Sequence, residues 1–210
     1  MGCGYDAAAS TLVASVPPST STRSKPIARR ALLARRDTLS EADRAAWSQR
    51  IAEAADALLA KHAQPGDAVA MYAAKGSEVD TTAIDTASRA RGLTVAYPRI
   101  VDDERLLAFH AARIDELVPA RFGLREPPFD APAIELARIA VFLVPGLAFD
   151  RRGGRIGWGR GHYDATLAAA PRARRIGLAY DFQLIDGVPR EEHDALLDEI
   201  LTEVATYTVA

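Results

Sequence analysis

Apolar and polar residues follow one another along this chain with two spacings, one typical of helices and one typical of buried strands. The apolar residues at positions 47, 51, 54, 55, 58 and 59 recur at intervals of three and four, as on one face of a helix. Ser40 before this run and Gln64-Pro65-Gly66-Asp67 after it predict a helix over 40–62. The unbroken apolar run Ile139–Val144 predicts instead a strand that is buried on both faces.

The rest of the pattern alternates between helices and strands. Ser24-Lys25-Pro26 is typical of a helix start, and this helix is expected to end near Arg36. We expect further helices over 81–91 and 163–170, and strands over 68–73, 94–97, 106–111, 175–180 and 204–209. Pro98 should end the strand over 94–97, and the proline-rich residues 122–132 should be irregular. This order predicts an α/β fold, a layered single domain with a mainly parallel sheet flanked by helices.

Composition narrows the class of protein without naming a function. Apolar residues make up 49% of the chain and charged residues 26%, which is ordinary for a soluble globular domain. The formal net charge of −2 gives no general attraction for nucleic acid or for a membrane surface. The single cysteine, Cys3, rules out an internal disulfide, as expected of a protein in a reducing cytoplasm. We therefore expect a cytoplasmic protein, with a monomer favoured and with neither nucleic acid nor membrane as partner.

The first 24 residues differ in composition from the remainder. They are rich in Ser, Thr and Ala, contain Pro17-Pro18 and carry one basic residue, Arg23. A secretory signal would need a basic start and a longer apolar run. We predict a disordered extension over 1–24 and a folded domain over 25–210.

Glycines at alternate positions mark the segment with the most distinctive chemistry, Gly157-Trp158-Gly159-Arg160-Gly161-His162-Tyr163-Asp164. Glycines so spaced favour neither a helix nor a packed strand, and they allow backbone amides to approach an anion such as phosphate. The segment follows the strand expected over 139–144 and precedes a helix, where α/β sheets bind ligands. Its spacing matches neither a P-loop nor a dinucleotide fingerprint, so a tight turn without a ligand is the alternative.

Several motifs, in chain order, carry a resemblance to a known family. They are Lys25 and Arg29 in the first helix, Gly76–Thr81, Tyr97-Pro98-Arg99, Gly123–Pro127, Val144–Asp150 followed by Arg155–Asp164, and Val188-Pro189 with His193-Asp194. Together they resemble the 5-formyltetrahydrofolate cyclo-ligases, also called methenyltetrahydrofolate synthetases, from about residue 25 to the end. The resemblance implies that the chain uses ATP and magnesium to convert 5-formyltetrahydrofolate to 5,10-methenyltetrahydrofolate, with release of ADP and phosphate.

The same resemblance implies roles for individual residues. Catalysis would involve Lys25, Arg155 and Tyr163, and Mg²⁺ would be held by Asp164 and Asp194. The folate would be bound by Glu78, Trp158, Arg160 and His162. The ATP site would comprise Lys25, Arg29, Arg155, Gly157, Trp158, Gly159, Arg160, Gly161, His162 and Tyr163. At His162 the chain departs from the family, in which most members carry an aromatic residue, commonly tyrosine.

Each of these residues also has a plainer interpretation. Lys25 and Arg29 are one helical turn apart and would suit a solvated helix end, and Asp164 would suit a helix N-cap. Trp158 would suit the core, while Glu78 and Asp194 would suit ordinary surface positions. Two other functions also stay open: a related enzyme with a different substrate, and a non-catalytic module that binds nucleotides or nucleic acid. Neither the loop glycines nor Asp164 is missing, which favours the enzyme.

Overall fold

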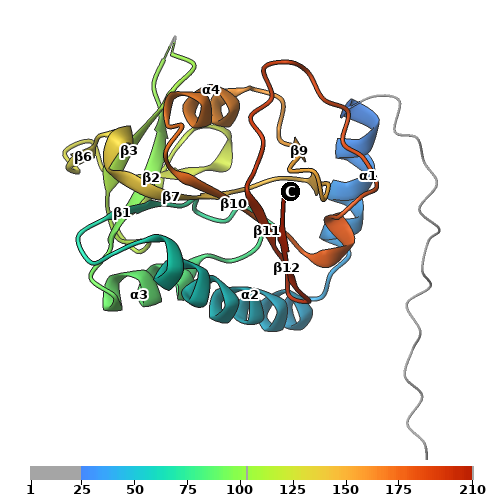
Figure 1. Cartoon of the computed structure of the whole chain (residues 1–210), viewed down its shortest axis with the longest axis horizontal. Helices are drawn as coiled ribbons and strands as arrows, with labels where there is room; N and C mark the ends of the chain where they lie inside the picture. Colours follow the sequence, from blue (N-terminus) through green and yellow to red (C-terminus); the bar gives the residue numbers. More distant parts are fainter. Residues whose placement is uncertain (1–24, 103, 210) are drawn as a thin grey trace, which may run out of the picture.

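The computed structural model describes residues 25–102 and 104–209, so the extension predicted over 1–24 lies outside the described residues. An eight-stranded sheet runs through the molecule in the order β12-β11-β10-β7-β1-β2-β3-β6 (Figure 1). The parallel strands are β11 (Glu199–Leu201), β10 (Arg174–Leu178), β7 (Ile139–Val144), β1 (Ala68–Ala70) and β2 (Thr94–Ile100). The antiparallel edge strands are β12 (Thr206–Thr208), β3 (Leu107–Ala111) and β6 (Ala133–Ile134). The predicted α/β domain with a mainly parallel sheet is confirmed.

Helices cover both faces of this sheet. Helices α2 (Glu41–His62) and α3 (Thr82–Ala90) lie on one face, α4 (His162–Ala169) lies on the other, and α1 (Lys25–Asp37) flanks the sheet (Figure 1). Two small ribbons, β4–β5 (Val118–Pro119 with Arg125–Glu126) and β8–β9 (Ala148–Phe149 with Arg155–Ile156), complete the strands, and three 3₁₀ turns span Arg121–Gly123, Leu136–Arg138 and Asp181–Gln183. None of the helices in the described part of the chain combines the length and apolarity needed to cross a bilayer.

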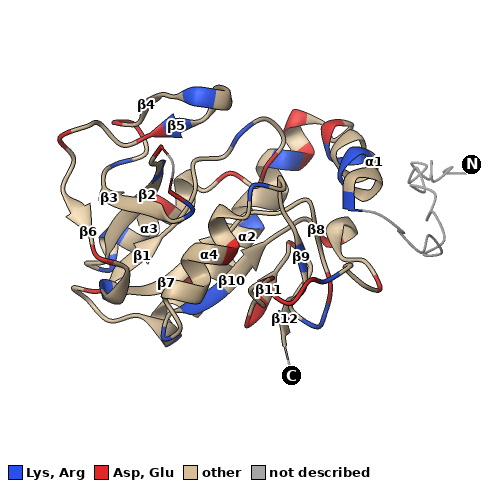
Figure 2. Ribbon diagram, turned by 90° about the horizontal axis from the view of Figure 1, so that it is seen from above, with Lys and Arg blue, Asp and Glu red and all other residues tan. Residues whose placement is uncertain are grey.

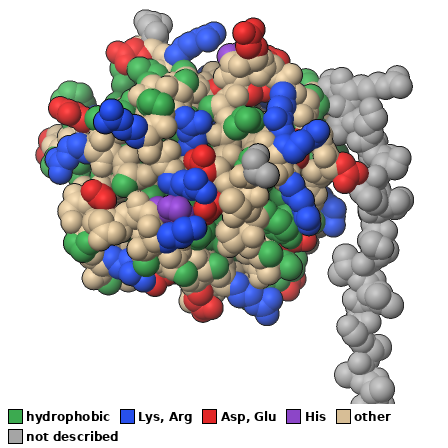
Figure 3. Space-filling model, viewed as in Figure 1, with side chains coloured by type: hydrophobic (Ala, Val, Ile, Leu, Met, Phe, Trp, Pro, Cys, Tyr) green, Lys and Arg blue, Asp and Glu red, His purple; other side chains and the backbone are tan. Residues whose placement is uncertain are grey.

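The buried strand β7 shows why this layering forms. Val141 and Leu143 belong to the core beneath α2, whereas Phe142 and Val144 belong to the core beneath α4. Successive side chains of a strand point to opposite faces, so an unbroken apolar run supplies both cores at once. On the outer surface, basic and acidic side chains are interspersed across the face drawn in Figure 3.

The prediction that Pro98 ends a strand is wrong. Strand β2 continues to Ile100, and Pro98 pairs with Phe109 of β3. Pairing with β1 stops at Ala96, so beyond that residue β2 has a neighbour on one side only. Proline is tolerated there because no ladder hydrogen bond is needed on the open side. Two further differences are that β1 ends at Ala70 rather than at residue 73, and that the short strand β11 was not expected.

Candidate active site

A cleft of about 1110 Å³ opens at the carboxyl ends of β1 and β7. Tyr72 and Ala73, just after β1, and Pro145, just after β7, form part of its wall. The next strand in the chain after β1, β2, lies on one side of β1, and the later strand β7 lies on its other side. The order in which strands are added to the sheet therefore reverses between β1 and β7. Open α/β sheets bind ligands in the crevice at such a switch point.

All residues predicted to bind ATP, folate or metal line this single cleft. They come from helix α1, from the loop after β1, from β9, from the glycine loop that follows it, from the first turn of α4, and from the segment before β11. The residues are Lys25, Arg29, Glu78, Arg155, Gly157, Trp158, Gly159, Arg160, Gly161, His162, Tyr163, Asp164 and Asp194.

One end of the cleft is formed by basic residues of α1. Lys25 Nζ lies 2.9 Å from Asp194 Oδ2 and 2.9 Å from Glu191 Oε1, so it joins α1 to the segment before β11. Arg29 Nε donates to the carbonyl of Gly157 at 2.7 Å, which fixes the glycine loop against the same helix. Figure 2 shows basic residues along α1. Cations and a glycine-rich backbone therefore meet at this end.

The loop glycines meet geometric demands that a side chain would violate. Gly159 has a φ of +90°, and a Cβ at this position would lie 3.0 Å from the guanidinium carbon of Arg29. A Cβ on Gly157 would lie 2.9 Å from Arg155 Nη1. Gly161 adopts the left-handed conformation at the N-cap of α4, with a φ of 72°. The loop therefore packs against Arg29 and Arg155. It leads directly into the N-terminus of α4, where free backbone amides and the helix dipole favour an anion.

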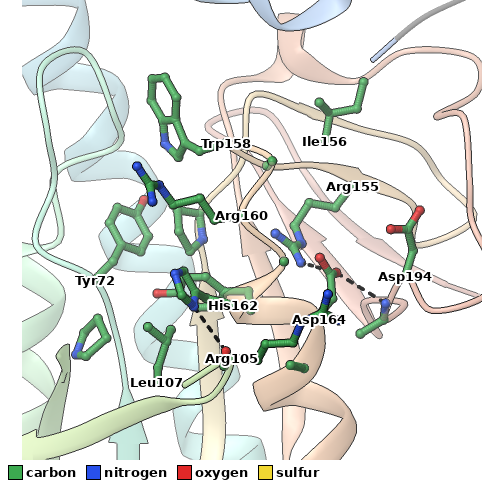
Figure 4. Close-up of a pocket in the computed structure, with 18 of the residues that line it drawn as sticks. Tyr72, Arg105, Leu107, Arg155, Ile156, Trp158, Arg160, His162, Asp164 and Asp194 are labelled. Atoms are coloured by element: carbon green, nitrogen blue, oxygen red, sulfur yellow. Dashed lines mark hydrogen bonds and ion pairs between the residues drawn. The ribbon is translucent and has the colours of Figure 1, made fainter. Parts of the chain in front are cut away.

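Arg155 and Asp164 form a close pair on the floor of the cleft (Figure 4). Arg155 Nη2 lies 2.5 Å from Asp164 Oδ1, and the Arg155 side chain is 5% exposed. Arg155 Nε is buried and has no hydrogen-bond partner in the described part of the chain. Asp164 lies in the first turn of α4 and is not its N-cap, because Gly161 occupies that position. The plainer interpretation of Asp164 as a capping residue is therefore wrong.

The two predicted metal ligands lie on adjoining segments. The amide of Ala195 lies 3.4 Å from Asp164 Oδ1, which brings the Asp194 segment against α4. No group of three His, Cys, Asp or Glu residues suited to a metal ion occurs among residues 25–102 and 104–209. Magnesium commonly takes one or two protein carboxylates and completes its shell with water and substrate phosphates. The carboxylates of Asp164 and Asp194, beside cationic side chains suited to phosphate, fit that ion.

The other end of the cleft holds Glu78, Trp158 and Tyr163. Glu78 Oε2 accepts the amide of Lys75 at 3.0 Å, and Glu78 Oε1 accepts the indole N–H of Trp158 at 3.3 Å. Trp158 is 50% exposed, so the interpretation of this residue as core is wrong. The hydroxyl of Tyr163 is buried and unpartnered within the described residues. Burial, together with the nearby Glu78 carboxylate, raises the pKa of Tyr163, so the hydroxyl stays protonated and able to donate.

Two residues that line the cleft, Phe122 and Arg105, were not predicted to belong to the site. The guanidinium of Arg160 lies 3.9 Å from the ring centre of Phe122, a cation–π contact between the glycine loop and the loop before β5. Phe122 has a φ of 61°, unusual for a residue other than glycine. His162 Nδ1 lies 3.1 Å from the carbonyl of Arg105. In the sequence, only the neighbouring Gly123–Pro127 motif pointed to the Phe122 loop.

Three motif residues without an assigned role turn out to support the fold. The hydroxyl of Tyr97 donates to Asp85 Oδ2 at 2.7 Å, and Tyr97 is fully buried. Arg99 Nη2 donates to the carbonyl of Pro127 at 2.9 Å. Glu126 Oε1 accepts the amide of Ile100 at 3.1 Å. The first contact fastens α3 to β2, and the other two fasten the β5 segment to β2 beside the cleft.

Asp150 holds the turn that precedes the glycine loop. This carboxylate is fully buried and accepts the amides of Arg152, Gly154 and Val188 at 2.9, 2.9 and 2.8 Å. Although burial opposes ionisation, these hydrogen bonds and Arg190 lower the pKa of Asp150. A buried ionised carboxylate needs such partners. Asp150 therefore fixes the β8–β9 ribbon from which Arg155 projects.

Known proteins of similar sequence and structure were compared with this chain. The family described as "5-formyltetrahydrofolate cyclo-ligase family" matches residues 21–203. A 5-formyltetrahydrofolate cyclo-ligase from Mycolicibacterium smegmatis is 38% identical over 188 residues, which cover 87% of this chain and 95% of that protein. The Escherichia coli K12 protein of the same name is 34% identical over 113 residues, covering 52% of this chain and 61% of that protein.

The solved structures agree with the sequence relatives. A 5,10-methenyltetrahydrofolate synthetase from Aquifex aeolicus superposes with a TM-score of 0.73 at 26% identity, covering 88% of this chain and 92% of that one. The Mycoplasma pneumoniae synthetase, at 24% identity, shares the fold with a TM-score of 0.70 over 85% of this chain and 98% of that one. Because the family match spans most of the chain and the Mycolicibacterium relative has nearly the same extent, the chain belongs to the 5-formyltetrahydrofolate cyclo-ligase family.

Proposed function

We propose that this protein uses ATP and Mg²⁺ to convert 5-formyltetrahydrofolate to 5,10-methenyltetrahydrofolate, releasing ADP and phosphate. The observation that carries this proposal is the single cleft, which joins a cationic glycine loop at one end to a carboxylate and aromatic side chains at the other. A phosphate donor and a flat heterocycle with hydrogen-bond donors therefore have complementary surfaces within one cavity. Membership of the cyclo-ligase family supports the same pairing of substrates.

The reaction needs an activated formyl oxygen. That oxygen attacks the γ-phosphorus of ATP, so an O–P bond forms and the bond to ADP breaks. The folate N10 then attacks the formyl carbon and loses its proton, and the phosphorylated oxygen departs as phosphate as the ring closes. Phosphoryl transfer of this kind depends mainly on positioning and on stabilisation of charge.

The α1 cations and the glycine loop suit the nucleotide. Lys25, Arg29 and Arg155 would neutralise the phosphates, while the amides around Gly157, Gly159 and Gly161 bind phosphate oxygens. Arg155 is already oriented by Asp164 and has one buried N–H without a partner, which a phosphate oxygen would satisfy. His162 and Tyr163, at the start of α4, follow the glycine loop directly and line the same cleft.

Asp164 and Asp194 are the residues that would hold Mg²⁺. When bound with ATP, the ion would neutralise phosphate charge during transfer. Asp164 is paired with Arg155, and Asp194 is paired with Lys25. Both cations would then be released toward the phosphates when the carboxylates bind the ion.

The opposite end suits the folate. Glu78 would accept hydrogen bonds from the donor edge of the pterin, and the half-exposed ring of Trp158 offers a stacking face. The protonated hydroxyl of Tyr163 is able to donate to a substrate oxygen. Arg160 and His162 lie at the mouth, where they would contact the folate on one side and the nucleotide on the other.

An ultraviolet assay of the purified protein tests the proposal. Protein, ATP, Mg²⁺ and 5-formyltetrahydrofolate should give the absorbance of the methenyl product, and omission of ATP should abolish it. No product from a protein that still binds ATP would assign the cleft to another substrate. Failure to bind ATP would overturn the nucleotide site itself. A monomeric state and a cytoplasmic location remain predictions from the sequence.

A further inference from the structure

We propose that Arg36 positions Glu78 for the folate, acting from behind the cleft as an ion-pair partner that leaves the carboxylate free to accept substrate hydrogen bonds. This inference rests on the proposed function, in which Glu78 contacts 5-formyltetrahydrofolate. Arg36 itself does not line the cleft. It is a positioning residue, and its effect would pass through Glu78.

The burial of Arg36 is unusual for its residue type. The side chain is 2% exposed, and it ranks among the largest fully buried side chains of the described residues. Arginine is rarely buried to this extent unless it is paired, because desolvation of a charge is costly. The guanidinium therefore needs an acidic partner. The carboxylate that faces its Nη2 atom is that of Glu78.

Arg36 contacts both the loop after β1 and the loop after β7, at the point where the strand order of the sheet reverses. Its Nε donates to Ser77 Oγ at 3.0 Å, and its Nη1 lies 3.4 Å from the carbonyl of Gly146. Ser77 Oγ in turn donates to Asp37 Oδ1 at 2.5 Å. The loop after β1 and the loop after β7 are thus held at a fixed separation by one side chain. Glu78 follows Ser77 directly and takes its position from this arrangement.

The separation between Arg36 and Glu78 has a chemical consequence. Arg36 Nη2 lies 4.0 Å from Glu78 Oε1, which is ion-pair distance but too long for a hydrogen bond. The charge therefore stabilises the carboxylate without using a lone pair of Oε1. That oxygen accepts only the exposed indole of Trp158, at 3.3 Å, within the described residues. A substrate N–H is able to join or replace this weak bond while Arg36 keeps the carboxylate in place.

The sequence spacing explains how a helix residue reaches this position. Lys25, Arg29 and Arg36 are separated by four and then seven residues, which places them on one face of α1. Along the helix axis Arg36 is about 16 Å from Lys25. The same face therefore supplies cations to the phosphate end of the cleft and to the back of the folate end.

Calorimetric binding to the full chain separates this role from a structural one. Arg36→Met should raise the dissociation constant of 5-formyltetrahydrofolate by about tenfold or more, the range expected when a charged hydrogen-bonding group loses its support. The dissociation constant of ATP should stay within about twofold, because Lys25 and Arg29 are unchanged. Arg30→Met is the matched control, since Arg30 is an exposed cation of the same helix, and it should change neither constant.

A double-mutant cycle shows whether Arg36 acts through Glu78. In a Glu78→Gln background, Arg36→Met should weaken folate binding little further. Equal weakening in both backgrounds, or weakening of folate and ATP together, would overturn the inference. If Arg36→Met does not fold, Arg36→Lys carries the same cycle, because lysine keeps a charge but cannot reach Ser77 and Gly146 at once.

The assay of turnover keeps the two proposals distinct. Wild-type protein that binds 5-formyltetrahydrofolate without turning it over would overturn the proposed reaction, while the cycle would still test Arg36. Wild-type protein that does not bind the folate would overturn both. Active wild-type protein with an unchanged folate constant in Arg36→Met would overturn the inference alone.

Discussion

Lys25 and Asp194, 169 residues apart, are joined by two contacts of 2.9 and 3.2 Å between Nζ and the carboxylate oxygens. Burial opposes both charges, yet the hydrogen bonds from Lys25 and from the amide of Glu191 lower the pKa of Asp194. Burial likewise opposes the Lys25 charge, but the bonds to Asp194 and Glu191 raise the pKa of Lys25. The pair thus connects the first described helix to the segment before β11 and stabilises both ions.

The pH dependence of stability should report this pair. A lowered carboxyl pKa stabilises the fold above the ordinary value of 3.8, and this stabilisation is lost as the pH falls through the folded value. A raised lysine pKa stabilises it below 10.5, and this is lost as the pH rises through the folded value. Asp194→Asn should therefore lower the free energy of unfolding by about 1 kcal/mol at most, evenly between about pH 5 and 9.

Urea unfolding at several pH values provides the measurement. The difference between wild type and Asp194→Asn should vanish in acid below the folded pKa of Asp194. Asp130→Asn, an exposed aspartate, serves as control and should match wild type throughout. A difference that grows in acid would contradict the assignment.

The metal assignment gives a prediction about turnover. Asp164→Asn should reduce Mg²⁺-dependent activity by about 100-fold or more, because the proposed Mg²⁺ ligand and the charged partner of Arg155 are lost together. The variant should still fold, although loss of the charged partner of the buried Arg155 should lower its thermal midpoint, so turnover is compared at a temperature well below both midpoints. Activity should be followed against Mg²⁺ concentration, with the exposed Asp186→Asn as control. Unchanged activity, or an unchanged requirement for Mg²⁺, would remove Asp164 from the metal site.

The parts of the fold and of the cleft that the sequence indicated share one property: each signal lies within a few neighbouring residues. Alternating glycines, the Lys25–Arg29 pair and the apolar run of β7 each follow from spacing within a few residues, and the fold predicted from them is confirmed. The structure brings the predicted site residues to one cleft because parallel strands end at one edge of the sheet.

What the sequence could not supply depends on pairing between distant segments. Pro98 breaks a strand only where both sides of that strand are paired, and the one-sided pairing beyond Ala96 is a property of the sheet. The burial of Arg36 depends in the same way on loops after two different strands. In the sequence Asp150 is the last residue of a motif. Its contact with the amide of Val188, 38 residues further along the chain, exists only in the folded structure.

Asp150 is predicted to be essential for stability. Asp150→Asn keeps one accepting oxygen but replaces the other by an NH₂ group that donates, so at least one buried amide loses its acceptor and faces a donor instead. We expect the free energy of unfolding to fall by about 2–4 kcal/mol, and the thermal midpoint to fall by several degrees. Differential scanning calorimetry checks this above about pH 5, where the wild-type carboxylate is charged. A midpoint equal to that of the exposed control Asp130→Asn would contradict this role.

Gly159 of the glycine loop can be compared with Gly66, a glycine outside the loop that has nearly the same backbone conformation. Gly159 has a φ of +90° and Gly66 a φ of +97°, but a Cβ meets the Arg29 guanidinium at 3.0 Å only at Gly159. Gly159→Ala and Gly66→Ala should each lose about 1–2 kcal/mol of stability from the left-handed backbone. Only Gly159→Ala should also weaken ATP binding, by about tenfold, because Arg29 is displaced. Equal ATP affinity in the two variants would separate the loop from the nucleotide.

Because the hydroxyl of Tyr163 has no partner among the described residues, its removal tests whether it acts in catalysis or only in packing. A buried hydroxyl without a partner costs free energy in the folded protein, so Tyr163→Phe should leave the thermal midpoint unchanged or raise it. If this hydroxyl donates to the substrate oxygen, kcat should nevertheless fall by about 10–100-fold. Tyr207→Phe is the reciprocal control, because the Tyr207 hydroxyl donates to Asp181 at 2.9 Å away from the cleft. That variant should lose about 1 kcal/mol of stability and keep full activity. If both variants lose activity in proportion to their loss of stability, Tyr163 is a packing residue. If Tyr163→Phe loses activity without losing stability, while Tyr207→Phe loses stability without losing activity, the Tyr163 hydroxyl takes part in the reaction.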